Sequence, residues 1–543
     1  MQGLMMNTPL LISSIAEHGA KYHGGREIVS VTADNPRHRY TYRECIGRAR
    51  QLANALDKLG LEHGDRVATL AWNDYRHLEA YYGMSGAGYV CHTINPRLFP
   101  EQLVFIINHA EDRWIFTDVM FVPLLEAIAD KISGVEGFVV MTDEAHMPET
   151  SLKNVVCYET LIAAESAEFT WPELDERTAS ALCYTSGTTG DPKGVLYDHR
   201  STVLHAFAAV APDTMNLSCH DSVLPVVPLF HVNAWGIPYS TFITGAKLVL
   251  PGPKMGDGEV LCELLDTEDV TLALGVPTVW LGLLQYAEKA GKRLDKLQRT
   301  IVGGAAVPRS MIEAFRDQHG VDLRQGWGMT ETSPLGAANS TKAGMESLTP
   351  DERLDLATKA GRGLFGCEMR IVDDEGVELP WDGEAYGALQ VRGPWVCSDY
   401  FKLEGGAGSH TDDGWFDTGD VATIDPGGYM AITDRTKDVI KSGGEWISSI
   451  ELENAAMGHP AVAEAAVIGI SHPKWTERPL LIVVKAEGQE VSKEELLAWY
   501  DGKVATWWIP NDVAFVEELP HTATGKIKKI ELRKQFTDYQ FPE

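Results

Sequence analysis

The spacing of apolar residues between positions 41 and 60 predicts one long amphipathic helix. Apolar side chains recur there at intervals of three and four residues and so share one helix face, namely Cys45, Ala49, Leu52, Leu56 and Leu59. Thr41 and Glu44 have the spacing of a capping box, in which each side chain accepts from the other residue's backbone N–H. Gly60 suits a helix C-terminus. We therefore predict a helix from Thr41 to Gly60.

Strand-like and helix-like segments alternate along most of the chain. Residues 66–72 are typical of a strand, 77–88 of a helix and 89–95 of a strand. The same alternation continues through 247–252, 259–270, 271–277, 278–291 and 299–308. Strands that alternate with helices form βαβ units, whose strands lie parallel in one sheet. The pattern predicts an α/β fold with stacked, largely parallel sheets.

The pattern changes after about residue 360. Short strand-like segments separated by turn residues are typical of a small antiparallel β-barrel, and they occupy 370–376, 387–393 and 428–434. From Arg435 onward the chain alternates again, but over a short stretch that is typical of a small α+β unit. The residues just before and after Arg435 are charged and carry few apolar side chains, which indicates a hinge.

Two domains follow from this change. We predict a large N-terminal domain, residues 1–434, made of stacked parallel-rich sheets plus the small β-barrel. We predict a small, mobile α+β domain for residues 435–543. The chain has 543 residues, too many for one hydrophobic core, which also requires at least two domains.

Charge and cysteine use narrow the choice of partners. The formal net charge of −30 argues against nucleic acid or an anionic membrane as a partner. The sequence contains no run of about 18 apolar residues, which a membrane-spanning helix would need. The N-terminus lacks the basic start of a signal peptide. The eight cysteines form no CxxC pair, which indicates reduced thiols rather than disulfides or zinc. We expect a cytoplasmic protein.

The sequence YTSGTTGDPKG, residues 184–194, combines glycines, hydroxyls and one ammonium. Glycines allow the backbone to approach a ligand closely, and successive backbone N–H groups form an anion-binding nest. The predicted ligand is a polyphosphate. The residues expected to surround it are Thr185, Ser186, Gly187, Thr188, Thr189, Gly190 and Lys193. The GxxxxGK pattern of a P-loop does not fit, because Pro192 stands at the place of its second glycine.

This loop resembles the phosphate-binding motif of the adenylate-forming superfamily, which contains acyl-CoA synthetases, peptide-synthetase adenylation domains and beetle luciferases. Further motifs follow in the family's order, so the resemblance covers most of the chain between Tyr184 and Lys529. It implies ATP, Mg²⁺ and coenzyme A as cofactors. It also implies a small domain that rotates between two half-reactions.

Two segments of the N-terminal domain match nucleotide-binding motifs of the family. The small residues of GGAAVP follow a strand and permit close approach of a ligand, and by resemblance they lie against adenine: Gly303, Gly304, Ala305 and Ala306. QGWGMTE is expected to form a tight glycine-rich turn, with Trp327 at a place where the family commonly has Tyr. Its nucleotide-binding residues are Gln325, Gly326, Trp327, Gly328, Met329 and Thr330, and Glu331 is the expected catalytic metal ligand for Mg²⁺.

Three later motifs complete the resemblance. In WFDTGD, Asp420 is expected to accept hydrogen bonds from the ribose hydroxyls. In the stretch before and through DRTKDVIKSGGEWIS, the family pattern implies contacts to nucleotide or coenzyme A from Ile432, Arg435, Lys437, Ser442, Gly443, Gly444, Glu445 and Trp446, with Lys437 as the hinge. In PHTATGKIKK, Lys526 is expected to bridge the acid's carboxylate and the phosphate as charge moves between them.

The acyl substrate is expected beside PLFHVNAWG. By resemblance, His231 gates entry of the carboxylate, and it joins Thr185, Glu331 and Lys526 as a catalytic residue. The residues expected to line the acyl site are His231, Trp235, Gly303 and Trp327. Two tryptophans in one pocket would shorten it, and aromatic edges favour a thioether sulfur by about 0.3–1.5 kcal/mol.

These motifs predict an ATP-dependent ligase that converts a short- to medium-chain acid to an acyl-adenylate and transfers it to coenzyme A. The sequence is similar to medium-chain acyl-CoA synthetases and, within them, to bacterial 3-methylmercaptopropionate–CoA ligases. That acid is the best expectation, although butyrate would fit as well. The alternatives are a free-standing amino-acid or aryl-acid adenylating enzyme, a luciferase-like oxygenase and a non-enzymatic adenylate-binding sensor. The expected partners are small molecules, and a homodimer is left open.

Overall fold

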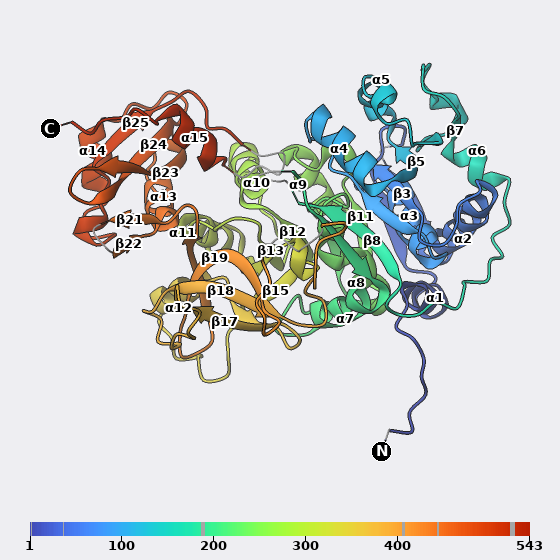
Figure 1. Ribbon diagram of the computed structural model, residues 1–543, viewed down its shortest axis with the longest axis horizontal. Coiled ribbons are helices and arrows are strands. Elements are labelled where there is room, and N and C mark those ends of the chain that lie inside the picture. The colour runs from blue at the N-terminus through green and yellow to red at the C-terminus, as the bar shows by residue number, and fades with distance from the viewer. Residues whose placement is uncertain are drawn as a thin grey trace.

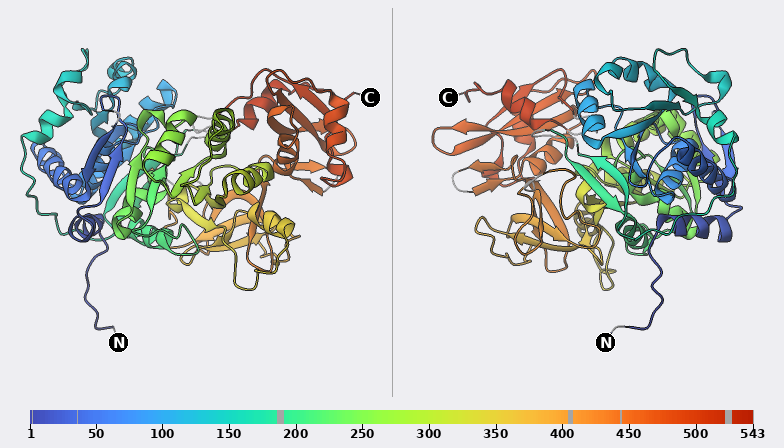
Figure 2. Two further views of the ribbon diagram at one scale, coloured as in Figure 1. Left: turned by 180° about the vertical axis from the view of Figure 1, so that it is seen from behind. Right: turned by 45° about the vertical axis from the view of Figure 1, so that its right-hand side comes forward.

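The computed structural model describes residues 1, 3–35, 37–185, 191–403, 408–442, 445–521 and 527–542, without the side chains of Glu445 and Trp446. Two large sheets with helices between them form most of the molecule, and a four-stranded sheet lies beside them (Figure 1). A small C-terminal unit forms one end. The N-terminal residues project away from the body in every view (Figure 2).

The first large sheet is parallel except at one edge. Within the described residues it has seven strands, and only the last pair, β8 and β9, is antiparallel. In spatial order the strands are β7 (Val155–Cys157), β6 (Gly137–Val140), β5 (Asp112–Thr117), β3 (Arg66–Leu70), β4 (Val90–Thr93), β8 (Ala179–Tyr184) and β9 (Gly194–Asp198).

The second large sheet has nine strands in the part of the chain that is described, and it is parallel from β14 to β1. Its outer pairs are antiparallel. In spatial order the strands are β16 (Arg362–Gly363), β15 (Leu335–Ala338), β14 (Asp322–Gly328), β13 (Arg299–Val302), β12 (Leu272–Gly275), β10 (Ser222–Pro225), β11 (Lys247–Leu250), β1 (Glu27–Ser30) and β2 (His38–Thr41).

Helices fill the space between the two sheets and cover their outer faces. Apolar residues of both sheets share one core with α1 (Ile12–Tyr22), α2 (Tyr42–Lys58), α3 (Tyr75–Gly86), α6 (Tyr158–Ala163), α7 (His199–Val210) and α8 (Ile237–Thr244). The outer face of the seven-stranded sheet packs against α4 (Pro100–Ala110) and α5 (Val122–Glu126). The outer face of the nine-stranded sheet packs against α9 (Gly258–Thr267), α10 (Pro277–Ala290), α11 (Arg309–Ala314) and α12 (Pro350–Ala357). The predicted α/β fold class is confirmed.

The amphipathic helix predicted from residue 41 onward is α2. Thr41 is its N-cap, and the reciprocal bonds of the capping box with Glu44 are both formed. Four of the five predicted apolar positions are buried inside the helix, namely Cys45, Ala49, Leu52 and Leu56, and Leu59 is its C-cap. Gly60 follows with φ of 76°, so the chain leaves the helix in the left-handed region that favours glycine.

The later part of the chain forms two smaller sheets. The antiparallel unit predicted after residue 360 consists of β17 (Glu368–Val372), β18 (Gly387–Arg392), β19 (Phe416–Ile424) and β20 (Met430–Arg435). The C-terminal unit has the sheet β22 (Glu445–Ile447), β21 (Ile440–Ser442), β24 (Thr476–Lys485), β23 (Val462–His472), with β25 (Asp512–Phe515) also on β24. Its helices are α13 (Ser449–Met457), α14 (Lys493–Trp499) and α15 (Lys529–Gln535).

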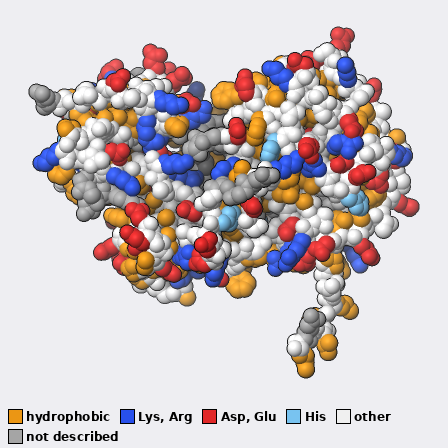
Figure 3. Space-filling model, viewed as in Figure 1, with side chains coloured by type: hydrophobic (Ala, Val, Ile, Leu, Met, Phe, Trp, Pro, Cys, Tyr) orange, Lys and Arg blue, Asp and Glu red, His pale blue; other side chains and the backbone are white. Residues whose placement is uncertain are grey.

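The predicted boundary at residues 434 and 435 falls at the end of β20, where Arg435 pairs with Asp420 of β19. The exact domain limits stay a prediction. Lys and Arg side chains gather around the hollow between the C-terminal unit and the rest of the molecule (Figure 3). In a chain with a net charge of −30, this local positive charge is suited to draw in an anionic substrate. No helix among the described residues is long and apolar enough to cross a membrane.

Candidate active site

The predicted phosphate loop is closed at its base by its two flanking residues. The backbone N–H of Thr185 donates to the carbonyl oxygen of Lys193 over 2.9 Å. The N–H of Lys193 donates to the Thr185 hydroxyl over 3.3 Å. Thr185 and Lys193 therefore stand at the two ends of the loop, between β8 and β9. The other predicted members lie outside the described residues, namely Ser186, Gly187, Thr188, Thr189 and Gly190.

Glu331 lies in a buried turn, Thr330–Thr332, shortly after β14. The Tyr400 hydroxyl donates to Glu331 Oε1 over 2.7 Å. The Tyr197 hydroxyl donates to the Thr330 carbonyl oxygen over 2.6 Å. Burial and the neighbouring Glu331 carboxylate both raise the pKa of Tyr400, so its phenol keeps the proton and acts as a donor at neutral pH.

A strap formed by residues 395–401 runs past this turn. The Cys397 N–H donates to the Glu331 carbonyl oxygen over 2.8 Å. The Phe401 N–H donates to the Gly194 carbonyl oxygen over 2.8 Å, directly after the phosphate loop. The strap therefore holds the loop and the turn that carries Glu331 at a fixed separation.

Lys193 extends from the phosphate loop toward the same strap. Its ammonium nitrogen lies 4.8 Å from the centre of the Tyr400 ring, within the range of a cation–π contact. Tyr400 thus contacts Lys193 with its ring and Glu331 with its hydroxyl. The structure thus brings a cation suited to phosphate and a carboxylate suited to Mg²⁺ into contact with the same side chain.

Asp420 is held by two donors from different strands. The indole N–H of Trp327, on β14, donates to Asp420 Oδ2 over 2.9 Å. Arg435 Nε, on β20, lies 2.9 Å from Asp420 Oδ1. Asp420 itself is buried and lies within the strand β19. A buried carboxylate with two fixed donors is oriented to accept further hydrogen bonds from a polar ligand.

The prediction of a tight turn across QGWGMTE is wrong for its first four residues, which belong to β14. The strand pairs in parallel with β13 on one side and antiparallel with β15 on the other. Position 328 in this strand admits only glycine, because a Cβ there would overlap the Pro334 carbonyl oxygen. The Gln325 amide donates to the Ala357 carbonyl oxygen over 2.9 Å, and Gly326 pairs with Ala338. The turn itself begins after Met329.

The segment after β13 approaches the predicted acyl site. A Cβ on Gly303 would lie 2.8 Å from the Gly326 carbonyl oxygen and 3.1 Å from Cη2 of Trp235. The absence of a side chain at Gly303 therefore lets the Trp235 ring approach the backbone just after β13. The next residues are exposed, namely Gly304, Ala305 and Ala306. Trp327 packs in a different apolar cluster, over Gly336 and beside the four-stranded sheet, so the two tryptophans are not in one cluster.

Trp235 belongs to a left-handed turn. Residues Val232–Gly236 all have positive φ, between 45° and 78°. Only glycine adopts this region without steric cost, and about 1–2 kcal/mol per residue is the usual penalty for others. The His205 ring packs against the end of the turn. It lies so close to Gly236 that a Cβ there would be only 2.9 Å from the ring. Strain of this kind persists where the surroundings fix one geometry, and it is common at ligand sites.

His231 immediately precedes the left-handed turn. It lines a small cavity with its neighbour in sequence, with residues at or just after the end of β4, and with residues of α4 and β8, namely Phe230, Thr93, Asn95, Leu98, Ile106 and Tyr184. Tyr184 is the residue before Thr185, so this cavity lies next to the base of the phosphate loop. The structure thus places His231 beside that loop and Trp235 beside Gly303.

A buried network spans the predicted hinge. Asp434 Oδ2 accepts from the Ser449 N–H over 2.7 Å and from the Ser449 hydroxyl over 2.6 Å. Lys529, on α15, donates to the same Ser449 hydroxyl and lies 2.8 Å from Glu453 Oε1. Lys437 is exposed between Asp434 and Ser449. The end of β20 is therefore bonded to the first turn of α13 and, through it, to α15.

The predicted coenzyme A residues are only partly described. Ser442 is buried on β21, and its hydroxyl accepts from Arg478 Nη1 over 3.2 Å. Ile432 lies on β20 opposite Ala422. Gly443, Gly444 and Lys526 lie outside the described residues, and Glu445 and Trp446 are described by their backbone in β22.

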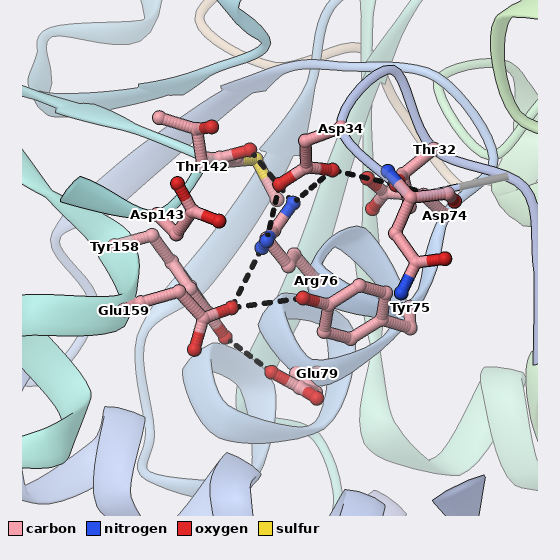
Figure 4. Close-up of polar contacts among 12 residues, drawn as sticks. Thr32, Asp34, Asp74, Tyr75, Arg76, Glu79, Thr142, Asp143, Tyr158 and Glu159 are labelled. Carbon is pink, nitrogen blue, oxygen red and sulfur yellow. Dashed lines mark hydrogen bonds and ion pairs between the residues drawn. The ribbon is translucent and has the colours of Figure 1, made fainter. Parts of the chain in front are cut away.

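A second charged cluster lies at the carboxyl end of the seven-stranded sheet (Figure 4). Arg76 Nη2 lies 2.8 Å from Asp34 Oδ2, and Arg76 Nε lies 2.8 Å from Glu159 Oε1. The Tyr75 hydroxyl donates to Glu159 over 2.9 Å, and the Tyr158 hydroxyl donates to Glu79 over 2.7 Å. These groups bond one another and tie α3 to α6 and to the connection between β1 and β2, which is a structural role.

Three groups at the edge of this cluster have atoms near enough to share a metal ion, namely Asp34, Asp143 and His146. The Arg76 guanidinium already neutralises Asp34, and with the other bonds to that carboxyl it lowers the pKa of Asp34 to about 2, against the effect of burial. The cluster therefore offers a cation a partly satisfied carboxylate beside an existing positive charge. Glu331 fits Mg²⁺ better, because it is a buried carboxylate beside the base of a phosphate loop and Mg²⁺ favours few carboxylates plus phosphate oxygens.

Tyr400 and Tyr197 are the site residues that the sequence did not reveal. Each comes from a segment far along the chain from the turn that it contacts, and neither belongs to a glycine-rich motif. Their only sequence signal is a tyrosine in a region of apolar residues, which is typical of any core.

Two family models match the chain. The model described as AMP-binding enzyme matches residues 16–401, and the model described as AMP-binding enzyme C-terminal domain matches residues 451–526. The first covers both large sheets and reaches Phe401 of the strap. The second begins in α13 and ends at Lys526.

Named relatives match along the whole chain. A 3-methylmercaptopropionyl-CoA ligase of Ruegeria lacuscaerulensis is 55% identical over 538 residues, which are 99% of each chain. A medium-chain-fatty-acid–CoA ligase of Ectopseudomonas oleovorans is 52% identical over 99% of this chain and 98% of its own. Among solved structures, the anthranilate CoA ligase AuaEII in complex with anthranoyl-AMP superposes with a TM-score of 0.87 and 25% identity, over 98% of both chains.

Proposed function

The chain belongs to the AMP-binding enzyme family, and we propose that it is an ATP-dependent acid–thiol ligase for a short- to medium-chain carboxylic acid. The observation that carries this proposal is the convergence of Lys193, Glu331 and Tyr400 at the base of the phosphate loop. The thiol is coenzyme A, and the best candidate acid is 3-methylmercaptopropionate. That choice is supported by the relative that bears its name and by the Trp235 ring at Gly303, which would limit the depth of an acyl site there.

The first half-reaction joins the acid to AMP. A carboxylate oxygen of the acid attacks the α-phosphorus of ATP, the bond to the bridging oxygen breaks, and pyrophosphate leaves with its electron pair. Lys193 and the loop donors hold the phosphates, and Lys526 balances the negative charge between carboxylate and phosphate. Glu331 would hold Mg²⁺, and the ion would supply further charge neutralisation. Asp420 would accept from the ribose hydroxyls, with Trp327 and Arg435 holding its orientation.

The second half-reaction transfers the acyl group. The coenzyme A thiolate attacks the carbonyl carbon of the acyl-adenylate, and AMP leaves, so that no oxidant or reductant is needed. We assign this step to a rotated position of residues 435–543 about Lys437. The pantetheine arm would then pass the segment Ser442–Trp446, and His231 would border the carboxylate's entry.

The remaining residues of the predicted site are part of this proposal. Adenine would lie against the exposed segment after β13 and the strand β14, with contacts from Gly304, Ala305, Ala306, Gln325, Gly326, Gly328 and Met329. The partners are an acid, ATP and coenzyme A. We also propose that the enzyme acts in the cytoplasm, binds neither nucleic acid nor membrane, and forms a homodimer. The homodimer is supported by the exposed apolar residues of the projecting N-terminal segment, namely Met1, Leu4, Met5 and Met6.

A pyrophosphate-release screen tests the proposed function. Short, medium, branched, aromatic, amino and thioether acids are supplied with ATP, with and without coenzyme A. We expect thioether and short acids to give the highest kcat/KM, and acyl-CoA to form only with coenzyme A. Best turnover with an amino or aryl acid, and no acyl-CoA, would instead identify a free-standing adenylating enzyme.

The Lys526→Ala variant provides the matching test of mechanism. It should nearly abolish pyrophosphate release while leaving thioester formation from supplied acyl-adenylate largely intact. An equal loss in the two half-reactions would show that Lys526 does not act in the first step alone.

A further inference from the structure

Tyr400 contacts two groups of the proposed site through different parts of its side chain. Its hydroxyl donates to Glu331 Oε1 over 2.7 Å. Its ring lies 4.8 Å from the Lys193 ammonium nitrogen. Both Tyr400 and Glu331 are more than nine-tenths buried, at 7% and 6% exposed. Water therefore competes little with either contact.

The backbone around Tyr400 fixes the side chain in this position. The Tyr400 N–H donates to its neighbour Asp399 Oδ1 over 2.8 Å. The next residue, Phe401, forms an isolated antiparallel bridge with Gly194. On the other side, the Cys397 N–H is bonded to the Glu331 carbonyl oxygen. Tyr400 is therefore tethered on one side to the phosphate loop and on the other to the Glu331 turn.

We propose that Tyr400 is a positioning residue for adenylation, whose hydroxyl orients the Glu331 carboxylate for a divalent cation and whose ring holds the Lys193 ammonium for phosphate. This inference rests on the proposed function. It assigns a role to a residue that lies in none of the glycine-rich motifs.

The hydroxyl acts by restricting one carboxylate oxygen. An ionised carboxylate has two oxygens and about four lone-pair sites. With Oε1 bonded to Tyr400, rotation of the carboxylate is restrained, and Oε2 and the remaining lone pair stay available. Loss of such an outer hydrogen bond typically costs about 10- to 100-fold in metal affinity.

The ring acts by holding a flexible cation. Lys193 has a four-carbon stem whose rotamers would otherwise be free. A cation–π contact at a desolvated site is worth more than at an exposed one. Removal of the ring therefore weakens phosphate binding, whereas removal of the hydroxyl alone does not.

Two variants of Tyr400 separate these roles. Tyr400→Phe removes the hydroxyl and keeps the ring, whereas Tyr400→Leu removes both. ATP binding is measured by calorimetry on the full chain, at a series of free Mg²⁺ concentrations and without acid or coenzyme A. We expect Tyr400→Phe to raise the Mg²⁺ midpoint by about tenfold, with the Kd for ATP at saturating Mg²⁺ within about twofold of wild type. Tyr400→Leu should also raise that saturated Kd.

Tyr158→Phe is the matched control, since Tyr158 is a buried tyrosine that donates to the Glu79 carboxylate over the same 2.7 Å, outside the proposed site. It should leave the Mg²⁺ midpoint unchanged. If Tyr400→Leu does not fold, Lys193→Met in the wild-type and Tyr400→Phe backgrounds replaces it: its effect on the saturated Kd should be the same in both.

Two results would overturn the positioning role of Tyr400, and a third would overturn the proposed function. An unchanged Mg²⁺ midpoint in Tyr400→Phe overturns the positioning role while the proposed function stands. An equal shift in Tyr158→Phe shows a general effect of losing a tyrosine–carboxylate bond and likewise overturns it. Failure of the wild-type protein to bind ATP in a Mg²⁺-dependent way overturns the proposed function itself.

Discussion

Trp327 donates its indole N–H to Asp420 over 2.9 Å, and this bond joins the nine-stranded sheet to the four-stranded sheet. Arg435 approaches the other carboxylate oxygen from β20. The candidate ribose acceptor is thus fixed by two strands of one sheet and one strand of another. The position of the Asp420 carboxylate, and of any ligand bound to it, therefore depends on how these two sheets pack together.

Trp327→Phe should therefore weaken both stability and nucleotide binding. Removing a donor to a buried carboxylate costs about 1–3 kcal/mol, so we expect the free energy of unfolding to fall by that amount. The KM for ATP should rise about fivefold or more, with little change in the KM for the acid. Denaturant titration and steady-state kinetics measure the two effects. Trp171→Phe is the control, because Trp171 donates to Glu17 over 2.7 Å in another part of the molecule; an equal rise in its KM for ATP would contradict the assignment.

Trp235→Ala should shift acid preference toward longer chains. The ring contacts Gly303, so its removal opens space along β13. A pocket discriminates by only about 1–3 kcal/mol per methylene, and its walls set chain length by obstruction. The kcat for the best long acid should stay within about tenfold, or 1.4 kcal/mol, while the KM for short acids rises. Values of kcat/KM across a series of acids decide the matter, and an unchanged ranking of chain lengths would remove Trp235 from the acyl site.

Lys437→Pro should separate the half-reactions. Proline fixes φ at about −65°, and Lys437 lies between two ends of a network that joins Asp434 to Ser449. We expect pyrophosphate release with the acid to survive and acyl-CoA formation to fail. Lys437→Ala, which keeps the backbone free, should complete both steps. Normal full turnover by the proline variant would place the hinge elsewhere, with Asp434 as the next residue to test.

Asp118→Asn should change how stability depends on pH. Burial and the neighbouring Asp74 raise the pKa of Asp118 well above its usual range, and burial raises the pKa of Asp74 to about 6. Carboxyls whose folded pKa is raised bind protons more tightly when folded, so stability is lost as pH rises from the unfolded pKa near 4 through the folded values.

The variant should lose less stability than wild type between pH 5 and pH 8, as measured by urea denaturation at several pH values. Asp34→Asn is a control of opposite sign. Its folded pKa of about 2 lies below the unfolded value, so its contribution is present at neutral pH and is lost as pH falls toward 2. Parallel pH profiles for wild type and Asp118→Asn would show that the folded pKa of Asp118 is not raised.

The sequence revealed those parts of the fold that depend on local periodicity. The helix α2 follows from its apolar spacing and its capping box, and both are formed as predicted. The strand β14 did not follow, because two glycines in seven residues are typical of a turn. Glycine is needed at position 328 because the Pro334 carbonyl oxygen, which follows the turn Thr330–Thr332, lies where a Cβ would be. Crowding from a partner strand leaves no periodic signal.

The residues of the candidate site also divide into those that the sequence could predict and those that it could not. Glu331, Asp420 and Lys193 could be predicted, because each belongs to a short motif whose residue types match one chemistry. Tyr400 could not, since its role depends on a strap that reaches Glu331 from a distant segment. The two tryptophans expected at the acyl site belong to different apolar clusters, since Trp327 lies over Gly336 whereas Trp235 lies at Gly303. Distances between segments come from tertiary packing, which the order of motifs does not encode.

The left-handed turn Val232–Gly236 has a consequence for how the enzyme family can diversify. The turn presents Trp235 from the connection before α8, whereas Asp420, Glu331 and Lys193 are carried by other segments. If the acyl site lies at Trp235, as we propose, a mutation that changes the size of residue 235 alters which acids are accepted and leaves the residues proposed to handle ATP in place. Acid preference and ATP chemistry would then be encoded by separate segments of the chain, so that one could change in evolution without the other.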